Sequence, residues 1–210
     1  MAVPERICAV IPAAGLSRRM GQCKQLLPLG GDTVIVRTVQ AALRGGAESV
    51  VVVTGQYRQA VEDALAPLGE RVTCVYNAAY AETDMLHSVQ LGVAALPDCD
   101  AFFLLPGDMP AVSAATFAAV RRCWSENQNA VVFPVFSGRK GHPVLIPRRY
   151  RALILSYAGT DGLRGLWHTC DTACAQVSDG GAVLDMDTPE SYEQVKRTLS
   201  QINRLEREEL

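Results

Sequence analysis

Short apolar segments alternate with longer amphipathic segments along most of this chain, and this alternation limits the folds that it can adopt. The apolar segments are rich in Val, Ile, Phe and Ala, and they occupy residues 7–11, 49–53, 72–76, 101–105 and 130–135. Runs of this length and composition are typical of strands that are buried on both faces, and helical spacing prevails between them. We therefore expect an α/β fold that is Rossmann-like, with three layers and a mostly parallel central sheet.

The length and composition fit one domain of this kind. The chain has 210 residues, of which 49% are hydrophobic and 20% are charged, as in ordinary globular proteins. We expect residues 1–210 to form a single domain, because the length is ample for one core and short for two. The formal net charge of −2 creates no broad attraction for nucleic acid, so we expect no nucleic-acid partner.

The sequence indicates neither a membrane nor an oxidising compartment. No apolar run reaches the ~20 residues that a transmembrane helix needs, and the run at 7–11 is as short as a strand and leads into a basic loop. The seven cysteines are odd in number and form no C-x-x-C pair, which indicates reduced thiols and a cytoplasmic location. Cys170, Cys174 and His168 have a spacing that metal ligands can use, but no second ligand pair accompanies them, so we favour a structural role.

The first candidate site is residues 12–24, PAAGLSRRMGQCK, which follow the first apolar run. Small residues at the turn would let backbone N–H groups approach phosphate oxygens, and the basic residues would supply the opposite charge. Lys24 offers a compact point charge that can follow a moving phosphoryl group. The loop has the spacing of neither a P-loop nor a G-x-G-x-x-G motif. The residues alone leave a phosphate site and a solvated basic turn equally open.

The second candidate is Asp108, in the segment AFFLLPGDMP at 101–110. An apolar strand runs directly into Pro-Gly-Asp-Met-Pro, so the carboxylate should be held at the carboxyl edge of the sheet. Mg²⁺ takes one or two carboxylates together with substrate phosphates, which fits an aspartate that faces a phosphate site. The alternative is a structural cap on a turn or on the helix that begins near Ser113. Beside the first loop, the metal hypothesis is the stronger one.

The third candidate is the acidic pair in VLDMDTPE at 183–190. Strand alternation would place Asp185 and Asp187 on the same side. Asp187 has a second explanation, because it precedes Pro189 at a helix start. We therefore favour Asp185 as the second acidic residue and keep Asp187 as the alternative.

Several other segments carry weaker predictions. We expect Thr54 at the carboxyl edge of the sheet, where ligands bind in such folds, and Ser88 either at the surface or in a polar contact near a ligand. Helical spacing points Met85, Val89 and Val93 inward. We also expect a flexible basic loop at 138–141, a helix at 148–157, and strands at 173–177 and 182–186.

These motifs resemble one family in their order and wording. A-A-G-x-S-x-R-M-G-x-x-K at 13–24, G-D-x-P at 107–110, G-H-P-V-L at 141–145 and D-x-D-T-P-E at 185–190 are similar to the MobA-like nucleotidyltransferases, specifically the molybdenum cofactor cytidylyltransferases. The resemblance spans residues 7–190 and implies a GT-A-like nucleotidyltransferase fold. One departure is Asp84, at a position where members usually have Gly before Met.

The resemblance also implies roles for individual residues. Catalysis would fall to Lys24, Arg19 and Asp108, with Mg²⁺ (or Mn²⁺) on Asp108 and Asp185. His142 would lie on the acceptor side of the cleft. The nucleotide would be bound by Ala13, Ala14, Gly15, Ser17, Lys24, Thr54 and Ser88.

The implied reaction is transfer of CMP from CTP to the terminal phosphate of molybdopterin cofactor, with release of pyrophosphate. Apo-molybdoenzymes of the xanthine dehydrogenase class would be possible partners. The turn reads Ala-Ala-Gly, whereas guanylyl-transferring relatives usually have Ala-Gly-Gly, so Ala14 favours CTP over GTP. Three alternatives stay open: a cytidylyltransferase for another phosphate such as methylerythritol phosphate, a GTP-using molybdenum cofactor guanylyltransferase, and a non-catalytic cofactor chaperone.

Overall fold

A mostly parallel sheet forms the centre of the molecule, as the sequence predicts. The computed structural model describes residues 5–17 and 20–208, with side chains as far as residue 199. The strands follow the order β10-β7-β9-β6-β1-β4-β5, and only β9 and the short β8 run against their neighbours. The bounds are β1 (Ile7–Pro12), β4 (Val50–Thr54), β5 (Val72–Tyr76), β6 (Ala101–Leu104), β7 (Val131–Phe136), β8 (Arg139–Lys140), β9 (Val144–Pro147) and β10 (Thr172–Gln176).

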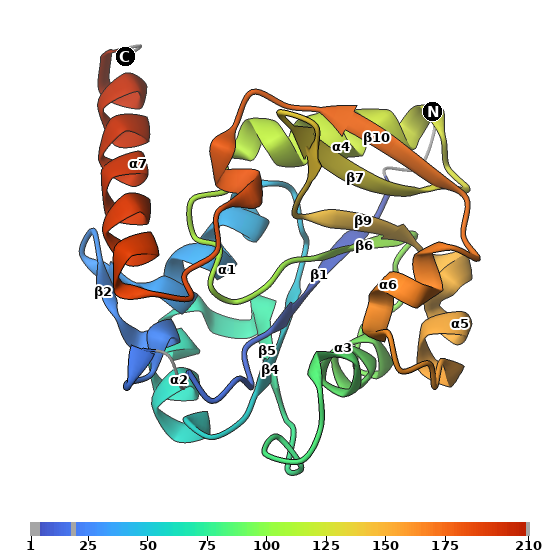
Figure 1. Cartoon of the computed structure of the whole chain (residues 1–210), viewed down its shortest axis with the longest axis horizontal. Helices are drawn as coiled ribbons and strands as arrows, with labels where there is room; N and C mark the ends of the chain where they lie inside the picture. The colour runs from blue at the N-terminus through green and yellow to red at the C-terminus, as the bar shows by residue number, and fades with distance from the viewer. Residues whose placement is uncertain (1–4, 18–19, 209–210) are drawn as a thin grey trace.

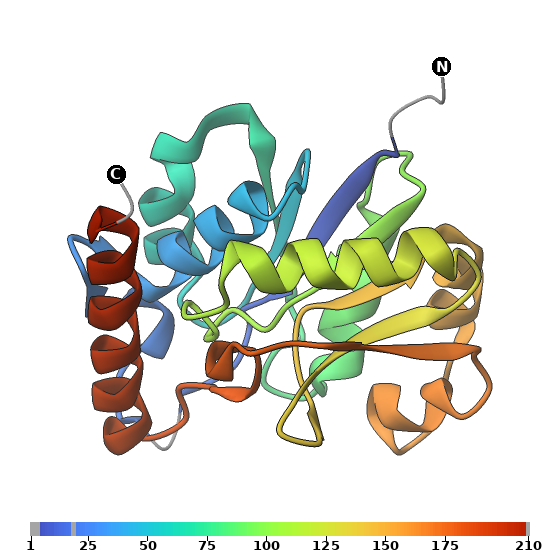
Figure 2. The ribbon, with the colours of Figure 1, turned by 90° about the horizontal axis from the view of Figure 1, so that it is seen from above.

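Helices cover both faces of this sheet, because alternate residues of each buried strand point to opposite sides. In β1, Ile7, Ala9 and Ile11 pack with helices α1 (Val34–Arg44), α2 (Arg58–Leu65) and α4 (Ala114–Glu126). Cys8 and Val10 pack with α3 (Met85–Ala94), α5 (Arg151–Ser156) and α6 (Gly162–Trp167). Figures 1 and 2 show the resulting three layers. No helix in the described ranges is both long enough and apolar enough to cross a bilayer.

The last helix, α7 (Pro189–Glu208), packs beside a small hairpin and not against the main sheet (Figure 1). The hairpin consists of β2 (Pro28–Leu29) and β3 (Asp32–Thr33). Leu29, Met186 and Val195 share one buried cluster there, and the Tyr192 hydroxyl donates a hydrogen bond to the Pro28 carbonyl. The closing segment of the chain is thereby held next to the segment that follows the basic loop.

The carboxyl ends of three adjacent strands meet closely at one edge of the sheet. The backbone N–H of Ala13 donates to the Val53 carbonyl at 2.8 Å, and that of Gly107 donates to the Pro12 carbonyl at 3.0 Å. A Cβ added to Gly55 would lie 2.4 Å from the Ala14 carbonyl oxygen. Glycine at this position therefore lets the small-residue turn lie directly against the end of β4.

Two of the predicted core-facing positions are confirmed in α3, and one is wrong. Val89 and Val93 are fully buried, whereas Met85 is 60% exposed. Asp84 is the N-cap of this helix, and its side chain accepts a hydrogen bond from the backbone N–H of His87 at 3.1 Å. Met85 is thus the first residue of the helix, and there its side chain faces outward.

Three other element predictions need correction. Residues 182–186 form no strand, because a 3₁₀ turn occupies Gly180–Val183 and irregular chain follows it. The basic loop at 138–141 instead contains β8, which pairs with β7 across a turn where Ser137 and Gly138 have φ of 48° and 78°. The helix expected at 148–157 is a 3₁₀ turn at Arg148–Tyr150 followed by α5.

Candidate functional site

The site is centred on Lys24, whose ammonium lies between two carboxylates. Its Nζ is 2.5 Å from Oδ2 of Asp108 and 2.9 Å from Oδ1 of Asp187. Lys24 is the last residue of the basic loop at 12–24, Asp108 follows β6, and Asp187 precedes α7. Their side chains are 15%, 10% and 31% exposed, so the cluster is largely shielded from bulk water. The two motifs predicted to carry a lysine and an aspartate therefore converge on one point.

The charge of Lys24 is stabilised by its two partners. Burial of the ammonium acts to lower its pKa, but the charges and hydrogen bonds of Asp108 and Asp187 outweigh that effect, and the pKa of Lys24 is raised above its usual 10.5. The side chain is therefore a permanent cation at neutral pH. An obligatory positive charge at this position suits an anionic ligand such as a phosphate.

The basic loop at 12–24 is shaped by an internal hydrogen-bond network. Ser17 has a positive φ of 50°. Its hydroxyl accepts a bond from the backbone N–H of Lys24 at 3.2 Å and donates to Oε1 of Gln25 at 3.3 Å. Gln25 is only 3% exposed, and its hydrogen bond to Ser17 holds the turn from the protein interior. Arg19, which the sequence predicts to be catalytic, lies outside the described residues.

Asp187 is fixed by hydrogen bonds at the start of α7. The Ser191 hydroxyl accepts bonds from the backbone N–H groups of Asp187 and Thr188, both at 3.0 Å. The Thr188 hydroxyl in turn accepts from the backbone N–H of Ser191 at 3.2 Å. This reciprocal cap satisfies the first turn of the helix, and it sets the position from which the Asp187 carboxylate reaches Lys24.

The segment that leads to Asp187 is anchored by Asp179. One carboxylate oxygen of Asp179 accepts bonds from the Ser113 N–H and the Thr116 hydroxyl, and the other accepts from the Gly181 N–H, all at 2.8 Å. The backbone N–H of His142 donates to the Ala182 carbonyl at 2.8 Å. The 3₁₀ turn is thereby tied to both α4 and β9, which explains why no strand forms here.

His142 lies at the start of β9, on the same edge as Asp108. Its Nδ1 donates to the Leu104 carbonyl at 3.2 Å, which leaves Nε2 as the acceptor of the neutral ring. Burial lowers the pKa of His142, against the opposing influence of the Leu104 carbonyl and of the Asp108 and Asp185 charges. Asp185 itself is exposed. The charge of Asp185 acts on His142, whereas Asp187 is the residue that contacts Lys24.

A cavity of about 420 Å³ opens beside the Lys24 cluster. Among the predicted nucleotide-binding residues, Gly15, Ser17 and Lys24 line it. The complete lining is Gly15, Leu16, Ser17, Met20, Lys24, Tyr80, Ala81, Thr83 and Asp187. The other predicted residues, Ala13, Ala14, Thr54 and Ser88, are buried at the same edge and lie outside this lining.

The far wall of the cavity comes from the loop at 77–84, which precedes α3. Asn77, which is 1% exposed, donates from Nδ2 to the hydroxyls of Thr83 and Ser88, both at 3.1 Å. Its Oδ1 accepts from the Ala79 N–H at 3.0 Å. This buried amide shapes the loop that carries Tyr80. Asn77 follows β5 directly, and a polar residue at the carboxyl end of a strand was the signal that could have identified it.

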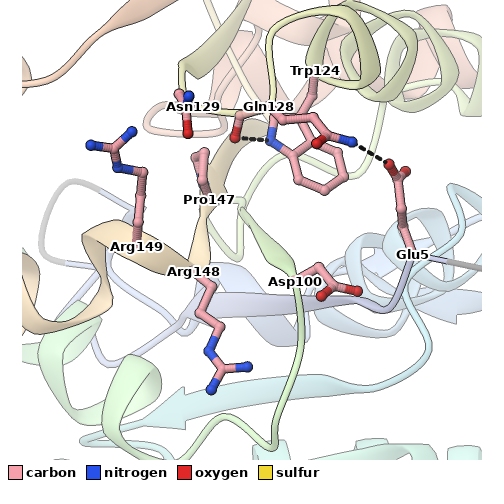
Figure 3. A pocket seen from close by; sticks show the side chains of 8 residues that line it. All are labelled: Glu5, Asp100, Trp124, Gln128, Asn129, Pro147, Arg148 and Arg149. Atoms are coloured by element: carbon pink, nitrogen blue, oxygen red, sulfur yellow. Dashed lines mark hydrogen bonds between the residues drawn. The ribbon is translucent and has the colours of Figure 1, made fainter. Parts of the chain in front are cut away.

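A second cavity, of about 440 Å³, lies at the opposite edge of the sheet (Figure 3). Its polar groups largely bind one another, since Gln128 Nε2 donates to Glu5 at 3.1 Å and Trp124 Nε1 donates to the Gln128 carbonyl at 3.1 Å. Arg148 pairs with Asp98 at 2.7 Å. Among the described residues, no ion pair joins the charged side chains that line this cavity, whereas Lys24 and Asp187 pair in the lining of the first one.

The Asp108–Asp187 pair fits a divalent cation whose coordination shell is completed by other ligands. Both carboxylates already share one positive charge within hydrogen-bond distance. Within the described ranges, no three or more His, Cys, Asp or Glu side chains form a metal-binding group. Mg²⁺ commonly takes one or two carboxylates together with phosphates and water, so a carboxylate pair beside a cavity matches that donor set.

A parallel sheet whose carboxyl edge carries a small-residue turn, a buried lysine and paired aspartates defines a nucleotide-binding α/β protein. A family model described as "MobA-like NTP transferase domain" matches residues 9–180. The chain belongs to this family, and it is a nucleotidyltransferase.

Individual relatives agree with this assignment. The molybdenum cofactor cytidylyltransferase of Escherichia coli K12 is 28% identical over 93% of this chain and 98% of its own length. A nucleotidyl transferase from Methanothermobacter has a TM-score of 0.77 at 26% identity, covering 93% of this chain and 99% of that one. The fold is shared by Rv0371c of Mycobacterium tuberculosis H37Rv, solved in complex with manganese, which has a TM-score of 0.71 at 24% identity and covers 93% of this chain and 100% of that one.

Proposed function

We propose that this protein transfers CMP from CTP to the terminal phosphate of molybdopterin cofactor, with release of pyrophosphate. Two observations support the proposal. The Lys24 cluster adjoins a cavity that is partly lined by the basic loop. A relative that spans nearly the whole chain is named a molybdenum cofactor cytidylyltransferase. We also propose that residues 1–210 act as one nucleotidyltransferase domain.

The chemistry that the chain must supply is mainly positioning and charge stabilisation. The acceptor is already a phosphate monoester, so its attacking oxygen needs little deprotonation. Phosphoryl transfer then depends on holding the two phosphates in line and on balancing the charge that develops. The permanently charged Lys24 would bind the reacting α-phosphate, and the backbone of Gly15 and Ser17 would hold the rest of the triphosphate.

Asp108 and Asp187 would hold a divalent cation, Mg²⁺ or Mn²⁺. Bound there, the cation would supply Lewis-acid stabilisation to the phosphate oxygens. The contact of Asp187 with Lys24 favours this residue over Asp185, our first expectation, as the second ligand. Asp185 and His142 would then face the acceptor, on the other side of Asp108. Arg19 would add a further phosphate contact.

The cellular setting is proposed on similar grounds. All seven cysteines are free thiols, which supports a cytoplasmic location, where thiols stay reduced. A cytosine dinucleotide cofactor made there would pass to apo-molybdoenzymes of the xanthine dehydrogenase class.

The observation that carries the proposal is the convergence of Lys24 and Asp108 beside the cavity. Pyrophosphate release tests it, with CTP or GTP as donor and with molybdopterin cofactor or methylerythritol phosphate as acceptor. We expect turnover only with CTP and the pterin, and Lys24→Met should reduce kcat by about 10²-fold or more. If turnover required methylerythritol phosphate, the proposed acceptor would be wrong, and if it required GTP, the proposed donor would be wrong. Binding without turnover would indicate a chaperone.

A further inference from the structure

A short hairpin with two exposed cations stands at the same edge of the sheet as the Lys24 cluster. Its strands are β7 and β8, which pair Val135 with Lys140 and Phe136 with Arg139. Because β9 is antiparallel to both β6 and β7, the carboxyl end of β7 lies at the same edge as that of β6. The two turn residues have φ of 48° and 78°, which suits the twist of a tight hairpin. Figure 2 shows the hairpin in dark yellow, projecting from the sheet.

The base of this hairpin is fixed close to Asp108, on the side of β6 that faces away from β1. A Cβ added to Gly141 would overlap the Ala182 carbonyl, so only glycine lets the chain pass there. His142 follows directly, and the charge of Asp108 acts on its ring. Two residues of extended chain span at most about 7 Å, so the backbone of Lys140 lies within that distance of His142.

The two cations point to opposite faces of the sheet, because adjacent strand residues alternate. Lys140 lies on the face that α3 and α6 cover, where its Nζ is 4.5 Å from the centroid of the Phe133 ring. That ring meets Trp167 edge-on at 5.8 Å. The loop at 77–84, which forms the far wall of the cavity, leads into α3 on this same face. A ligand that extended from the cavity along this face would therefore meet Lys140 and not Arg139.

Carboxylates leave both cations of the hairpin unneutralised. Among the described residues, no Asp or Glu lies within ion-pair distance of Arg139 or Lys140. An acceptor phosphate would approach this edge past Asp108 and Asp185, which repel it. His142 offers no compensating charge, because burial lowers its pKa and its ring is neutral. An acceptor phosphate therefore needs a cation on this side of Asp108, and Lys140 supplies one.

We propose that Lys140 binds the terminal phosphate of the acceptor, on the opposite side of Asp108 from Lys24. The contact with Phe133 would restrict the ammonium to this side without neutralising it, so that the phosphate receives a charge-assisted hydrogen bond. The inference rests on the proposed function for the presence of an acceptor phosphate, and it adds the residue that selects for one.

Steady-state pyrophosphate release with CTP and molybdopterin cofactor tests this assignment. Lys140→Met should raise the KM for the acceptor about tenfold, because a hydrogen bond to a charged group is lost. The kcat and the KM for CTP should stay within about twofold of the wild type, since the contact is equally strong before and during the reaction. Lys140→Arg keeps the charge and should restore most of the affinity. The matched control is Arg139→Met, which removes the neighbouring cation from the other face and should behave as the wild type.

Protection of the amine gives a second readout, which needs neither turnover nor a variant that folds. The chain contains three lysines, Lys24, Lys140 and Lys196. Labelling of the wild type with acetic anhydride, followed by mass spectrometry, measures the acetylation rate of each. Molybdopterin cofactor should slow the acetylation of Lys140 severalfold, whereas CTP should leave this rate unchanged. Lys196, in an exposed ion pair with Glu193, is the internal control and should be unaffected by either ligand.

The inference is overturned if Lys140→Met keeps the wild-type KM for the acceptor, or if Arg139→Met raises this KM as much as Lys140→Met does. It is also overturned if the acceptor slows the acetylation of Lys140 no more than that of Lys196. If turnover with CTP and the pterin accompanies any of these results, the proposed function stands without this role for Lys140. If methylerythritol phosphate is used in place of the pterin and protects Lys140, the proposed acceptor is wrong and Lys140 remains the phosphate ligand.

Discussion

Removing the Asp179 carboxylate should both destabilise the protein and impair the site, although Asp179 does not line the cavity. Its three hydrogen bonds, each 2.8 Å long, join Ser113, Thr116 and Gly181. Bonds to a charged group are worth about 1.5–3 kcal/mol each and are not additive. Because Asp179 is half-buried and water can replace part of the loss, we expect Asp179→Ala to cost about 3 kcal/mol of unfolding free energy.

This cost converts to a measurable shift in melting temperature. For a chain of this size, 1 kcal/mol corresponds to about 2–4 °C, so the expected decrease is about 6–12 °C. Urea unfolding at 25 °C gives the free energy directly. The matched control is Asp63→Ala on α2, whose carboxylate accepts an exposed bond from Gln59 at 2.9 Å. This change should stay within about 0.5 kcal/mol of the wild type.

The same variant should affect ligand binding, because Asp179 anchors the segment that leads to Asp187. Below its melting temperature, Asp179→Ala should raise the KM for nucleotide and weaken cation binding, whereas Asp63→Ala should change neither. If the free energy of unfolding of Asp179→Ala is within about 0.5 kcal/mol of the wild-type value and its KM is unchanged, then Asp179 does not hold the segment in place, and our account of it is wrong.

Three further predictions concern the same edge of the sheet. Gly55→Ala places a Cβ 2.4 Å from the Ala14 carbonyl oxygen, so the turn must shift, and the KM for CTP should rise about tenfold or more; an unchanged KM would contradict the close packing. Ala14→Gly should lower the ratio of CTP to GTP turnover in steady-state assays, and an unaltered ratio would remove the role of this methyl group. Burial lowers the pKa of His142 in the folded protein, so as the pH falls the unfolded chain binds a proton at this histidine before the folded protein does. The free energy of unfolding should therefore be highest above pH 6.5 and should decline below it. Urea unfolding from pH 5 to 8 should show a smaller decline in the free energy of unfolding for His142→Asn than for the wild type. Parallel curves for the two proteins would show that His142 is not the group responsible.

Much of the fold could be predicted because the main strands are apolar on both faces. The runs at 7–11 and 101–105 correspond to β1 and β6, whose residues are all buried, and the helix expected to begin near Ser113 is α4. Local pattern failed where a tertiary contact decides the conformation. The pattern at 182–186 predicts a strand, but the hydrogen bonds of Asp179 hold the chain in a 3₁₀ turn at Gly180–Val183, which includes the first two of these residues.

The site was predictable in part for the same reason. Lys24 and Asp108 stand in motifs that follow buried strands, so the carboxyl edge of a parallel sheet brings them together. Asp185 was favoured over Asp187 because Asp187 could be explained by its place at a helix start, yet in the structure Asp187 both precedes α7 and contacts Lys24. Tyr80 was missed because its position depends on the buried amide of Asn77, and no periodic pattern reports such a contact.

The pairing of Lys24 with Asp187 joins residues that are 163 positions apart. During synthesis, the ribosome must therefore produce nearly the whole chain before the second carboxylate can reach the lysine. Pairing at such a separation carries a high loop-closure entropy and is expected late in folding. A nascent or truncated chain that ends before α7 could form the sheet but not the Lys24–Asp187 pair, so the candidate site is complete only in the finished molecule.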